Sequence, residues 1–547
     1  MKILTASQMQ RIDKLTTERY GIPSTTLMEN AGAGVVEFLS RRFAPLDRHQ
    51  ITVFCGRGNN GGDGFVAARL LREKGLSPRV LLFARSDALK GDAALNYKRL
   101  LAWATPEEIP DSVTWQQVKP SLAGTSLIID ALLGTGLSKP LEGFLLEVVR
   151  DLNSGFPGAR RIAVDLPSGL SSDTGELVGE CFRADASVTF TAPKYAHVFP
   201  PACEMVGKWE VREIGTPREA LENDPELFLR LITQEDLLWL TQPRKIDSHK
   251  GTYGHVLILA GSVGKTGAAA MAARAALRSG TGLVTIATAK SALPVIATLG
   301  MEFMTEPLPE TSEGTISLRA LDEGYLDRLL EGKSVLAIGP GMGRVDETSE
   351  LVRQVVNRYD LPMILDADAL NAFAGRMNEM VTQARVRILT PHPGEMARLE
   401  GLKTAEVQQQ RIQVARKFAI RYEVHLVLKG ARTLVASPDG DVAVNPTGNP
   451  GMATGGTGDC LTGMIAGLLA QHLNRSTSDV VSAAVYLHGL AGDFAARRMG
   501  EASMIAGDLL EAVPKAFRAL AARHCPPLTP SPSLRWQGES VPTGRSE

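Results

Sequence analysis

Short apolar runs separated by helix-length segments make up the hydrophobic pattern of the first part of the chain. Residues 7–39 follow a helical pattern, with Ser7 as the predicted N-cap and a break at residues 21–23. The apolar runs that follow do not alternate with polar residues, and this favours a parallel sheet covered by helices on both faces. The predicted strands are residues 51–55, 79–83, 126–134, 161–166 and 186–192.

A second, larger unit with the same rhythm follows a charged stretch between Gly215 and Lys250. Its predicted strands are residues 255–261, 282–288, 334–339, 363–368, 387–390 and 425–430. Residues 433–445 predict a hairpin that turns at Asp439 and Gly440 and adds an antiparallel edge. The predicted fold class is α/β with two three-layer domains. We expect the first domain over residues 1–217, a linker and the first helix of the second domain over 218–245, the second domain over 246–523, and a disordered Pro/Ser-rich tail over 524–547.

Composition narrows the function classes. With 44% hydrophobic and 22% charged residues, the 547-residue chain has the composition of an ordinary globular protein. Its 59 basic residues nearly balance 60 acidic ones, so no global field draws it to nucleic acid or to a membrane, and we expect neither partner. The five cysteines are scattered without CxxC spacing, and no apolar stretch approaches the ~20 residues of a membrane span, so we expect a cytoplasmic protein.

The first predicted strand runs directly into a glycine-rich loop at residues 56–64, which holds five glycines, two asparagines and an aspartate. Such a loop before a helix is typical of phosphate binding, because glycines let the backbone approach the phosphate and the helix start supplies N–H donors. A plain turn explains five glycines poorly. A Rossmann dehydrogenase remains an alternative, although the next strand is followed by Arg85 before Asp87 instead of by the expected acidic residue.

Two further predicted strands carry carboxylates toward the same sheet edge. Asp130 and Asp165 each follow an apolar run, where a buried carboxylate is costly unless it is paired or solvated at a site. Each aspartate alone would be read as a helix cap, but Ser168 and the glycines nearby favour a site. The next strand brings Lys194 to this edge, where its ammonium group could lie beside Asp165, although a single lysine is more often a surface residue.

The strongest signal in the second domain is residues 455–459, GGTGD, which open an apolar helix. Glycines at a helix start hold an anion, and Asp459 beside them could accept a proton from an attacking hydroxyl.

Residues 261–266 resemble a P-loop, but the spacing requires glycine where Leu259 stands, so we reject that interpretation. A glycine loop at 339–343 indicates close ligand approach. His392, between two prolines at a strand end, is as consistent with a functional as with a structural role.

These motifs, taken together, resemble one family. LMENAG (27–32), NNGGDG (59–64), GTG (134–136) and DLPSG (165–169) look like the NAD(P)H-hydrate epimerase domain, which is Rossmann-like. HKGTYGHVLILAGS, GPGMG, DADALN, TPHPGE, KGART and GGTGD look like the ribokinase-like, ADP-dependent NAD(P)H-hydrate dehydratase domain. The order of the domains and their fusion are similar to those of bacterial bifunctional members.

For the first domain, the resemblance implies a K⁺ site and a pocket for the hydrated dinucleotide. The implied K⁺ ligands are Asn60, Asp130 and Ser168. Asp165 would contact the substrate and form an acid/base pair with Lys194. The residues implied to hold the substrate are Asn59, Asn60, Gly61, Gly62, Asp63, Gly134, Thr135, Gly136, Leu137, Ser138, Lys139, Pro140 and Asp165.

For the second domain, the resemblance implies ADP-dependent dehydration with Mg²⁺, with Asp459 as the proton acceptor. The implied substrate-binding residues are Ala268, Gly343, His392 and Asp459. The implied ADP-binding residues are Lys429, Gly430, Ala431, Arg432, Thr433 and Gly458. The substrates would be NADHX and NADPHX, the hydrated forms of NADH and NADPH. Both epimers would be repaired, with NAD(P)H, AMP and phosphate as products, by a chain that we expect to form a homo-oligomer.

Two alternatives remain open from the residues. A ribokinase-like kinase acting on a small molecule such as a vitamin would use the same GGTGD loop, and would release a stable phosphorylated product. The N-terminal unit could also bind nucleotides or proteins without turnover and regulate its partner domain.

Overall fold

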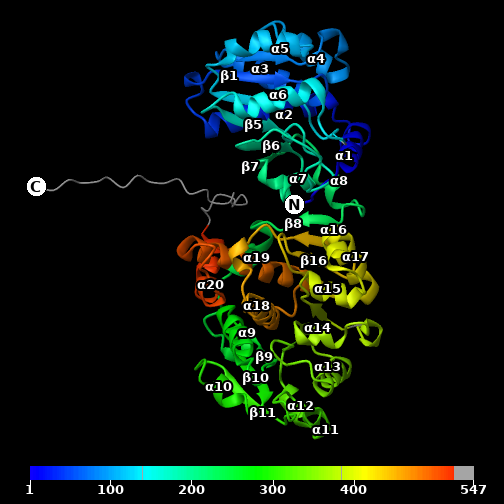
Figure 1. Ribbon diagram of the computed structural model, residues 1–547, viewed down its shortest axis with the longest axis vertical. Helices are drawn as coiled ribbons and strands as arrows, with labels where there is room; N and C mark the ends of the chain where they lie inside the picture. The colour runs from blue at the N-terminus through cyan, green and yellow to red at the C-terminus, as the bar shows by residue number, and fades with distance from the viewer. Residues whose placement is uncertain (138, 383–384, 523–547) are drawn as a thin grey trace, which may run out of the picture. The chain divides into compact units, whose positions relative to one another are not determined.

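The computed structural model describes residues 1–137, 139–382 and 385–522 (Figure 1). The chain forms two compact units, one with residues 2–227 and the other with Met1 and the described residues from Phe228 onward. The division falls inside the segment predicted to link the domains. Residues 218–227 belong to the first unit, and the second unit begins with a strand ahead of the 3-10 helix Glu235–Thr241. Ser138 and the predicted disordered tail lie outside the described residues.

The N-terminal unit contains a seven-stranded sheet in the order β3-β2-β1-β4-β5-β6-β7, in which all paired strands are parallel. The strands are β1 (Ile51–Cys55), β2 (Arg79–Leu82), β3 (Glu107–Glu108), β4 (Leu127–Ala131), β5 (Arg160–Val164), β6 (Ala186–Phe190) and β7 (Lys208–Arg212). The order reverses direction between β1 and β4. Ligands of open α/β sheets bind at the carboxyl ends of the strands beside such a switch point.

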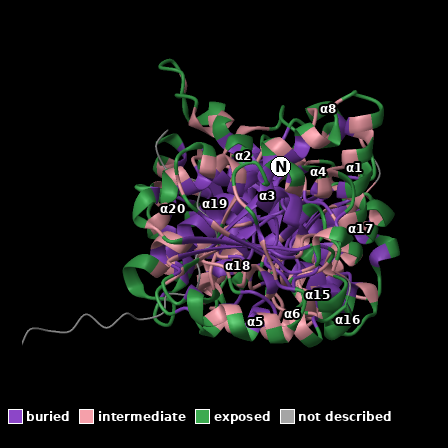
Figure 2. Cartoon of the chain, turned by 90° about the horizontal axis from the view of Figure 1, so that it is seen from above, coloured by how far each residue is buried: buried purple, intermediate pink, exposed green. Residues whose placement is uncertain are grey.

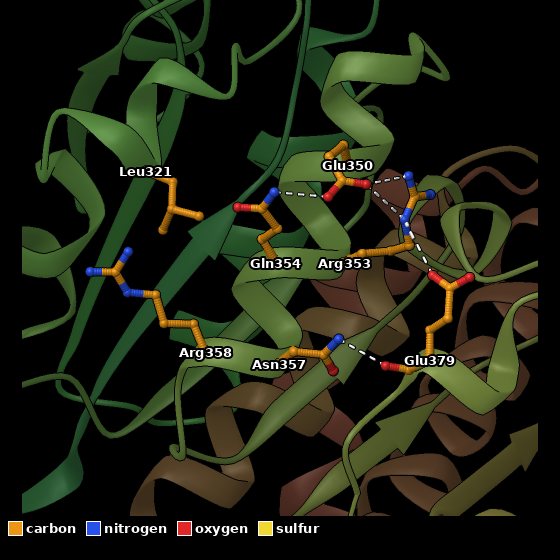
Figure 3. A pocket seen from close by; sticks show the side chains of 7 residues that line it. All are labelled: Leu321, Glu350, Arg353, Gln354, Asn357, Arg358 and Glu379. Carbon is orange, nitrogen blue, oxygen red and sulfur yellow. Dashed lines mark hydrogen bonds and ion pairs between the residues drawn. The ribbon is translucent and has the colours of Figure 1, made fainter.

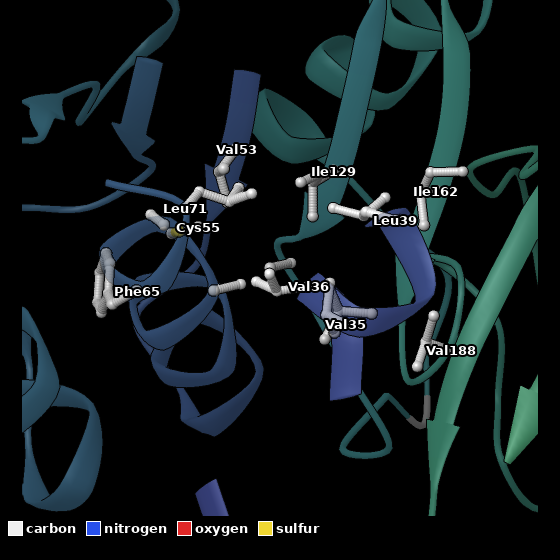
Figure 4. Close-up of a cluster of buried hydrophobic side chains, with 14 of the residues drawn as sticks. Val35, Val36, Leu39, Val53, Cys55, Phe65, Leu71, Ile129, Ile162 and Val188 are labelled. Carbon is white, nitrogen blue, oxygen red and sulfur yellow. The ribbon is translucent and has the colours of Figure 1, made fainter. Parts of the chain in front are cut away.

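Helices cover both faces of this sheet because successive strand residues point to opposite sides. Val53 and Cys55 of β1 pack with α2 and α3 (Figure 4), whereas Phe54 packs with Trp115 of α5 and with α6 on the other face. The helices are α1 (Ala6–Glu18), α2 (Ser24–Arg42), α3 (Asn59–Glu73), α4 (Gly91–Leu100), α5 (Ser112–Val118), α6 (Gly143–Ser154), α7 (Tyr195–Val198) and α8 (Arg218–Glu222). The predicted three-layer architecture is therefore confirmed for this domain.

The first helix begins earlier than the sequence suggested. Thr5, and not Ser7, is the N-cap of α1, because Thr5 and Gln8 form a reciprocal capping box: the Thr5 hydroxyl accepts from the Gln8 N–H, and the Gln8 side chain accepts from the Thr5 N–H. Ser7 lies within the first turn. The glutamine three residues after Thr5 is the signal that identifies this cap.

The C-terminal unit contains a ten-stranded sheet in the order β11-β10-β9-β12-β13-β14-β15-β16-β17-β8. The paired strands are parallel except that β16 runs antiparallel to β15 and β17, as the predicted hairpin requires. The strands are β8 (Leu229–Leu231), β9 (His255–Leu259), β10 (Leu283–Ala289), β11 (Met304–Leu308), β12 (Val335–Ile338), β13 (Met363–Leu365), β14 (Arg387–Leu389), β15 (His425–Leu428), β16 (Leu434–Ala436) and β17 (Val442–Val444).

Helices α9 and α18 pack closely together in this unit. A Cβ atom on Gly463 would meet the carbonyl oxygen of Ala272 at 2.0 Å, so only glycine allows this approach of the two backbones. The helices are α9 (Thr266–Arg278), α10 (Leu293–Ala297), α11 (Arg319–Asp322), α12 (Tyr325–Leu330), α13 (Asp346–Arg358), α14 (Asp368–Ala372), α15 (Pro393–Glu400), α16 (Thr404–Gln409), α17 (Arg411–Tyr422), α18 (Thr457–Gln471), α19 (Thr477–Met499) and α20 (Ala506–Ala521).

Burial follows the layers: the sheets and the central helix α18 are buried, and the outer helices expose their polar sides (Figure 2). In α16, for example, Val407 is buried and the other residues are exposed. Over the part of the chain that the structure describes, no helix is long and apolar enough to cross a membrane.

Candidate active sites

Asp130, Ser168 and Asn60 meet at the carboxyl ends of the strands of the N-terminal sheet. Asp130 in β4 is fully buried and accepts hydrogen bonds from the Ser168 hydroxyl at 2.7 Å and the Ser168 N–H at 2.8 Å. Leu133 connects the third residue: its N–H donates to the Ser168 hydroxyl at 2.9 Å, and its carbonyl accepts from the Asn60 amide at 2.9 Å. The structure therefore brings the three predicted K⁺ ligands together.

The oxygen atoms of this cluster suit a hard cation. The side-chain oxygen Oδ1 of Asn60 is buried and has no hydrogen-bond partner among the described residues. Burial raises the pKa of Asp130 to about 6, although hydrogen bonds from Ser168 and Leu132 favour its ionised form. A bound cation would provide a partner for the Asn60 oxygen and charge compensation for the carboxylate. Within the described ranges no group of three or more His, Cys, Asp or Glu side chains could hold a metal ion, so a cation bound here would also need amide and hydroxyl oxygens.

Asp165 and Lys194 form a buried ion pair at the same edge of the sheet. The ammonium Nζ of Lys194 lies 2.6 Å from Oδ1 of Asp165 and also donates to Thr189 Oγ1 at 2.9 Å and to the Phe190 carbonyl at 3.1 Å. The Lys194 side chain is 1% exposed. Asp165, directly after β5, has a φ of 62°, which is unusual for a residue other than glycine and marks a position held by its surroundings.

Neighbouring groups determine the ionisation of Asp165 and the orientation of Asp165 and Lys194. Burial opposes ionisation of Asp165, but the charge and hydrogen bond of Lys194 outweigh it, so the pKa of Asp165 lies below its usual value. His197 orients both residues: its Nδ1 accepts from the Lys194 N–H at 3.1 Å, so Nε2 carries the proton that is donated to the Asp165 carbonyl at 3.0 Å. Burial lowers the pKa of His197 to about 4, and the ring is neutral.

Sequence reasoning identified Asp165 and Lys194 but missed Thr189 and His197. Thr189 lies inside an apolar strand and gives no sequence signal. His197 follows Lys194 by three residues, which is the spacing of one helical turn, and could have been considered on that ground.

The glycine-rich segment 56–64 is a loop only at its start, because α3 begins at Asn59 and Gly61, Gly62 and Gly64 lie in its first turns. These glycines allow close packing. A Cβ atom on Gly61 would meet the carbonyl oxygen of Gly56 at 1.9 Å, and one on Gly62 would meet the Met28 sulfur at 2.6 Å. Asn59 is exposed at the start of the helix, whereas Asp63 is buried.

The second predicted substrate loop, residues 134–140, lies next to the first. Gly134 is adjacent to Asn60, because a Cβ atom built on Gly134 would lie 3.3 Å from the Cβ of Asn60. The carbonyl of Thr135 accepts from the Ser172 hydroxyl at 3.1 Å. Leu137 is partly buried, and the residues that the loop exposes are Gly136, Lys139 and Pro140.

In the C-terminal unit, Asp459 lies in the first turn of α18, whose N-cap is Gly456 in a left-handed conformation. Asp459 is therefore not the cap of this helix. Gly458 brings α18 close to Lys429 and Asp366: a Cβ atom on Gly458 would lie 3.4 Å from Lys429 Nζ and 3.9 Å from Asp366 Oδ2. The glycine run thus places the start of α18, which carries Asp459, beside the Lys429 ammonium group and the Asp366 carboxylate.

The surroundings of Asp459 raise its proton affinity. Burial raises the pKa of Asp459 to about 7, with Asp366 and Asp368 acting in the same direction and Lys429 opposing them. Lys429 Nζ lies 2.9 Å from Asp366 and 3.9 Å from Glu395. Burial alone would lower the pKa of Lys429, but these carboxylates hold it above its usual value. A carboxyl group that titrates near neutral pH is suited to accept a proton.

Asp366 and Asp368 belong to the DADALN motif but were given no individual roles from the sequence. Asp366, after β13, accepts from the Thr462 hydroxyl at 2.8 Å as well as from Lys429. Asp368 accepts from the Gly343 N–H at 2.9 Å and pairs with Arg344 at 3.1 Å. The signal for Asp366 was present: a carboxylate that directly follows an apolar strand, as Asp165 does in the other domain.

The remaining predicted substrate residues lie around this cluster. A Cβ atom on Gly341 would lie 3.1 Å from the Cβ of Ala268, so the glycine loop after β12 contacts the start of α9. His392 caps α15: its Nδ1 accepts from the N–H groups of Gly394 at 3.0 Å and Glu395 at 3.3 Å. Burial lowers the pKa of His392, whose side chain is still 51% exposed. The structure therefore gives His392 a capping role, and the other ring nitrogen, Nε2, lies 3.6 Å from Oε1 of Glu395.

The loop that follows β15 contains the residues predicted to hold ADP. Gly430 and Arg432 have positive φ values of 138° and 56°, and the Thr433 hydroxyl donates to the Gly430 carbonyl at 3.0 Å. Arg411 fastens the loop by donating to the carbonyl of Ala431. This arrangement turns the loop sharply beside Lys429.

Two cavities of the described chain lie away from these clusters. One, of about 370 Å³, is lined by residues of α13 and its neighbours (Figure 3). Its charged groups already pair with one another: Glu350 accepts from Arg353 at 2.6 Å and from Gln354 at 2.8 Å. The other cavity, of about 440 Å³, is lined partly by Ile51 and Arg79, the first residues of β1 and β2. It therefore lies at the amino ends of these strands, opposite the edge that carries Asp130 and Asp165. Neither cavity brings catalytic groups together.

Family models match both units of the chain. Residues 24–196 match the family described as YjeF-related protein N-terminus, and residues 256–515 match NAD(P)H-hydrate dehydratase. A solved structure of an ADP/ATP-dependent NAD(P)H-hydrate dehydratase from Bacillus subtilis, co-crystallized with ATP/Mg²⁺, is 35% identical. It covers 53% of this chain and 98% of its own, with a TM-score of 0.48.

The chain contains two α/β domains. Each has a glycine-rich segment and carboxylates at the carboxyl ends of its strands, and this defines a two-domain enzyme that acts on nucleotides. The bifunctional NAD(P)H-hydrate repair enzyme of Moorella thermoacetica is 42% identical over 95% of this chain and 97% of its own length. That of Escherichia coli is 35% identical over 92% of each chain. The chain belongs to this family of bifunctional NAD(P)H-hydrate repair enzymes, and it is an enzyme with epimerase and dehydratase activities. The repair function is thereby favoured over the vitamin kinase that the residues alone left open.

Proposed function

We propose that the N-terminal domain interconverts the two epimers of NAD(P)HX and that the C-terminal domain dehydrates the S epimer at the expense of ADP. The observation that carries the proposal is the position of Asp459, in the first turn of a glycine-opened helix beside Lys429 and Asp366. This arrangement combines a proton acceptor with anion-binding N–H groups, which is what phosphoryl transfer to a hydroxyl needs.

The dehydration follows from the leaving group. Hydroxide leaves poorly from C6 of the hydrated nicotinamide ring, whereas phosphate leaves well. Asp459 accepts the proton of the C6 hydroxyl. The oxygen of that hydroxyl takes the terminal phosphoryl group of ADP, and AMP departs. Phosphate then leaves as the ring nitrogen's lone pair forms a double bond to C6, and loss of a proton from C5 completes NAD(P)H.

The remaining residues of the C-terminal cluster hold the reactants. The loop from Lys429 to Thr433, with Gly458, holds ADP, and Lys429 offsets the charge of the transferred phosphoryl group. Ala268, Gly343 and His392 contact the hydrated nicotinamide nucleotide. Carboxylates close to an anion site fit Mg²⁺, which binds through one or two carboxylates and substrate phosphates and supplies charge neutralisation. Asp366, which lies beside Lys429 and Gly458, would hold this ion.

In the N-terminal domain, the residues near the switch point hold the substrate and one cation. Asn60, Asp130 and Ser168 hold K⁺, which the unpaired oxygen of Asn60 favours. The start of α3, residues 59–63, and the loop 134–140 hold the dinucleotide phosphates, and Ser138 in that loop lies outside the described residues. Asp165 and Lys194 contact the reacting end of the substrate, where Asp165 exchanges protons with it.

The test uses mixed epimers of NADHX and of NADPHX, Mg²⁺ and either ADP or ATP, with the return of reduced-nicotinamide absorbance as the readout. We expect complete conversion of both epimers and faster turnover with ADP than with ATP. Repeating the assay with Na⁺ in place of K⁺ tests the ion site, since only epimerisation should slow. Equal turnover with ATP would remove the ADP assignment, and a stable phosphorylated product would favour the kinase alternative.

We infer a cytoplasmic location from cysteine usage, because the five cysteines are scattered along the sequence without CxxC spacing. The homo-oligomer stays a prediction, which light scattering of the purified chain checks.

A further inference from the structure

Helix α19 carries the segment of residues 445–457, which leads into α18 and the GGTGD run. Two glycines of the helix make room for this segment. A Cβ atom on Gly489 would meet the hydroxyl oxygen of Thr447 at 2.3 Å, and one on Gly492 would meet the sulfur of Met452 at 2.3 Å. Any side chain at these two positions would push the segment away, so α19 is shaped to hold it.

Two polar side chains of α19, next to these glycines in sequence, hold the segment by hydrogen bonds. Asp493 accepts from the N–H of Gly448 at 3.1 Å and from the side-chain amide of Asn449 at 3.0 Å. His488 is buried, and its Nε2 lies 2.9 Å from the carbonyl oxygen of Thr457. A carbonyl oxygen can only accept, so Nε2 carries the proton that is donated. Burial lowers the pKa of His488 to about 4, and the ring is neutral.

The bond from His488 reaches the start of the catalytic helix. Thr457 is the first residue of α18, directly after the N-cap Gly456, and Asp459 follows two positions later. The run of residues 455–458 contains three glycines, and Gly456 has a φ of 91°. Glycine loses more conformational freedom on folding than any other residue, so such a run needs support from outside itself to keep one geometry. His488 supplies support from a different helix.

We propose that His488 is a positioning residue of the dehydratase site. Its imidazole N–H fixes the start of α18, so that the first N–H groups of this helix and the Asp459 carboxylate meet the reactants in the geometry of phosphoryl transfer. The proposal rests on the ADP-dependent dehydration proposed above for this domain. Catalysis of phosphoryl transfer is almost entirely positioning and charge stabilisation. A displacement of about 1 Å can therefore cost about 10²-fold in rate.

The proposal also predicts which kinetic constant changes. ADP in the ground state is held mainly by the loop from Lys429 to Thr433, which α19 does not need to fix. The start of α18 acts on the phosphoryl group during its transfer. A contact that matters in the transition state alone lowers kcat and leaves KM nearly unchanged.

The test measures dehydration of the purified S epimer with ADP and Mg²⁺, at a temperature at which circular dichroism shows every variant to be folded. His488→Met fills the space without an N–H donor and is expected to lower kcat roughly 10–10²-fold, with KM for ADP changed by less than about threefold. His488→Gln keeps an amide N–H and is expected to recover most of the rate. The matched control is His425→Met, a partly buried histidine at the amino end of β15, away from the site, which should keep the wild-type rate.

The outcomes separate the two proposals. If the wild-type chain does not dehydrate the S epimer with ADP, the proposed dehydration itself is wrong. If the wild type is active and His488→Met lowers Tm but not kcat, His488 serves packing only and the positioning role is refuted. Equal losses of kcat in His488→Met and His488→Gln also refute it, because the N–H donor is then not what matters.

A second variant keeps the test decisive if His488→Met does not fold. His488→Asn has a donor that lies closer to the backbone of α19 than Nε2 does, so it falls short of the Thr457 carbonyl. A kcat lowered at least about tenfold, with epimerisation by the other domain unchanged, supports the positioning role. A wild-type kcat in this variant overturns it.

Discussion

Replacing Asp459 by asparagine is expected to abolish most ADP-dependent dehydration without unfolding the chain. Asparagine has nearly the same shape as aspartate but cannot accept the hydroxyl proton. Loss of a positioned general base costs roughly 10²–10⁴-fold in rate, or about 3–5 kcal/mol of transition-state stabilisation. A helix cap is worth about 1 kcal/mol, and the cap of α18 is Gly456, so the replacement removes no cap. A purely structural Asp459 therefore predicts no comparable loss of rate.

The pH dependence gives an independent check. Since the pKa of Asp459 is raised to about 7, its base form increases as pH rises through 7, and wild-type dehydration should rise between about pH 6 and 8. The variant should lack this rise. The same raised pKa means that ionisation lowers the stability of the folded protein as pH rises from about 4 to 7, so Asp459→Asn should not lower Tm at pH 8.

The assay uses the purified S epimer with ADP and Mg²⁺, and measures the return of reduced-nicotinamide absorbance together with Tm. The matched control is Asp479→Asn, an exposed aspartate in the first turn of α19, which tests the loss of a negative charge at a helix start. We expect the control to retain wild-type turnover. Near-normal turnover by a folded Asp459→Asn protein would refute the catalytic role and the dehydration mechanism with it.

Three further changes test the N-terminal domain. Asp130→Ala should weaken K⁺ dependence and slow R-to-S conversion while dehydration of the S epimer stays intact; unchanged epimerisation kinetics would exclude the ion site. Lys194→Met should leave Asp165 buried without its partner, lower the free energy of unfolding in urea by about 3–5 kcal/mol and abolish epimerisation; unaltered stability would contradict the buried pair. Gly61→Ala places a methyl group 1.9 Å from a backbone carbonyl and should reduce Tm and activity, whereas Gly58→Ala has open space and should be tolerated; equal Tm values for the two variants would show that the segment is not packed in this way.

Several strands could not be predicted because their sequences lack a buried apolar run. β7 is only partly buried along its length, and most residues of β11 are partly or fully exposed, so neither carries the hydrophobic signature of a central strand. β3 has two residues, too few for a pattern, and β8 lies in the segment predicted as a linker and a helix. These four strands flank sheets whose central strands were all located, since a strand buried on both faces must be apolar along its length.

The sequence by itself determined the class of fold, the edges of the sheets where chemistry occurs, and most residues of both candidate sites. It could do so because apolar runs are local, and because parallel strands bring their carboxyl ends, with Asp130, Asp165 and Lys194, to one edge. Only the tertiary structure decided which groups pair and which stay unpaired. That Lys194 contacts Asp165 and that Asp366 faces Lys429 depend on packing between segments distant in sequence. The proton affinities depend on burial and on neighbouring charges, which no local pattern specifies.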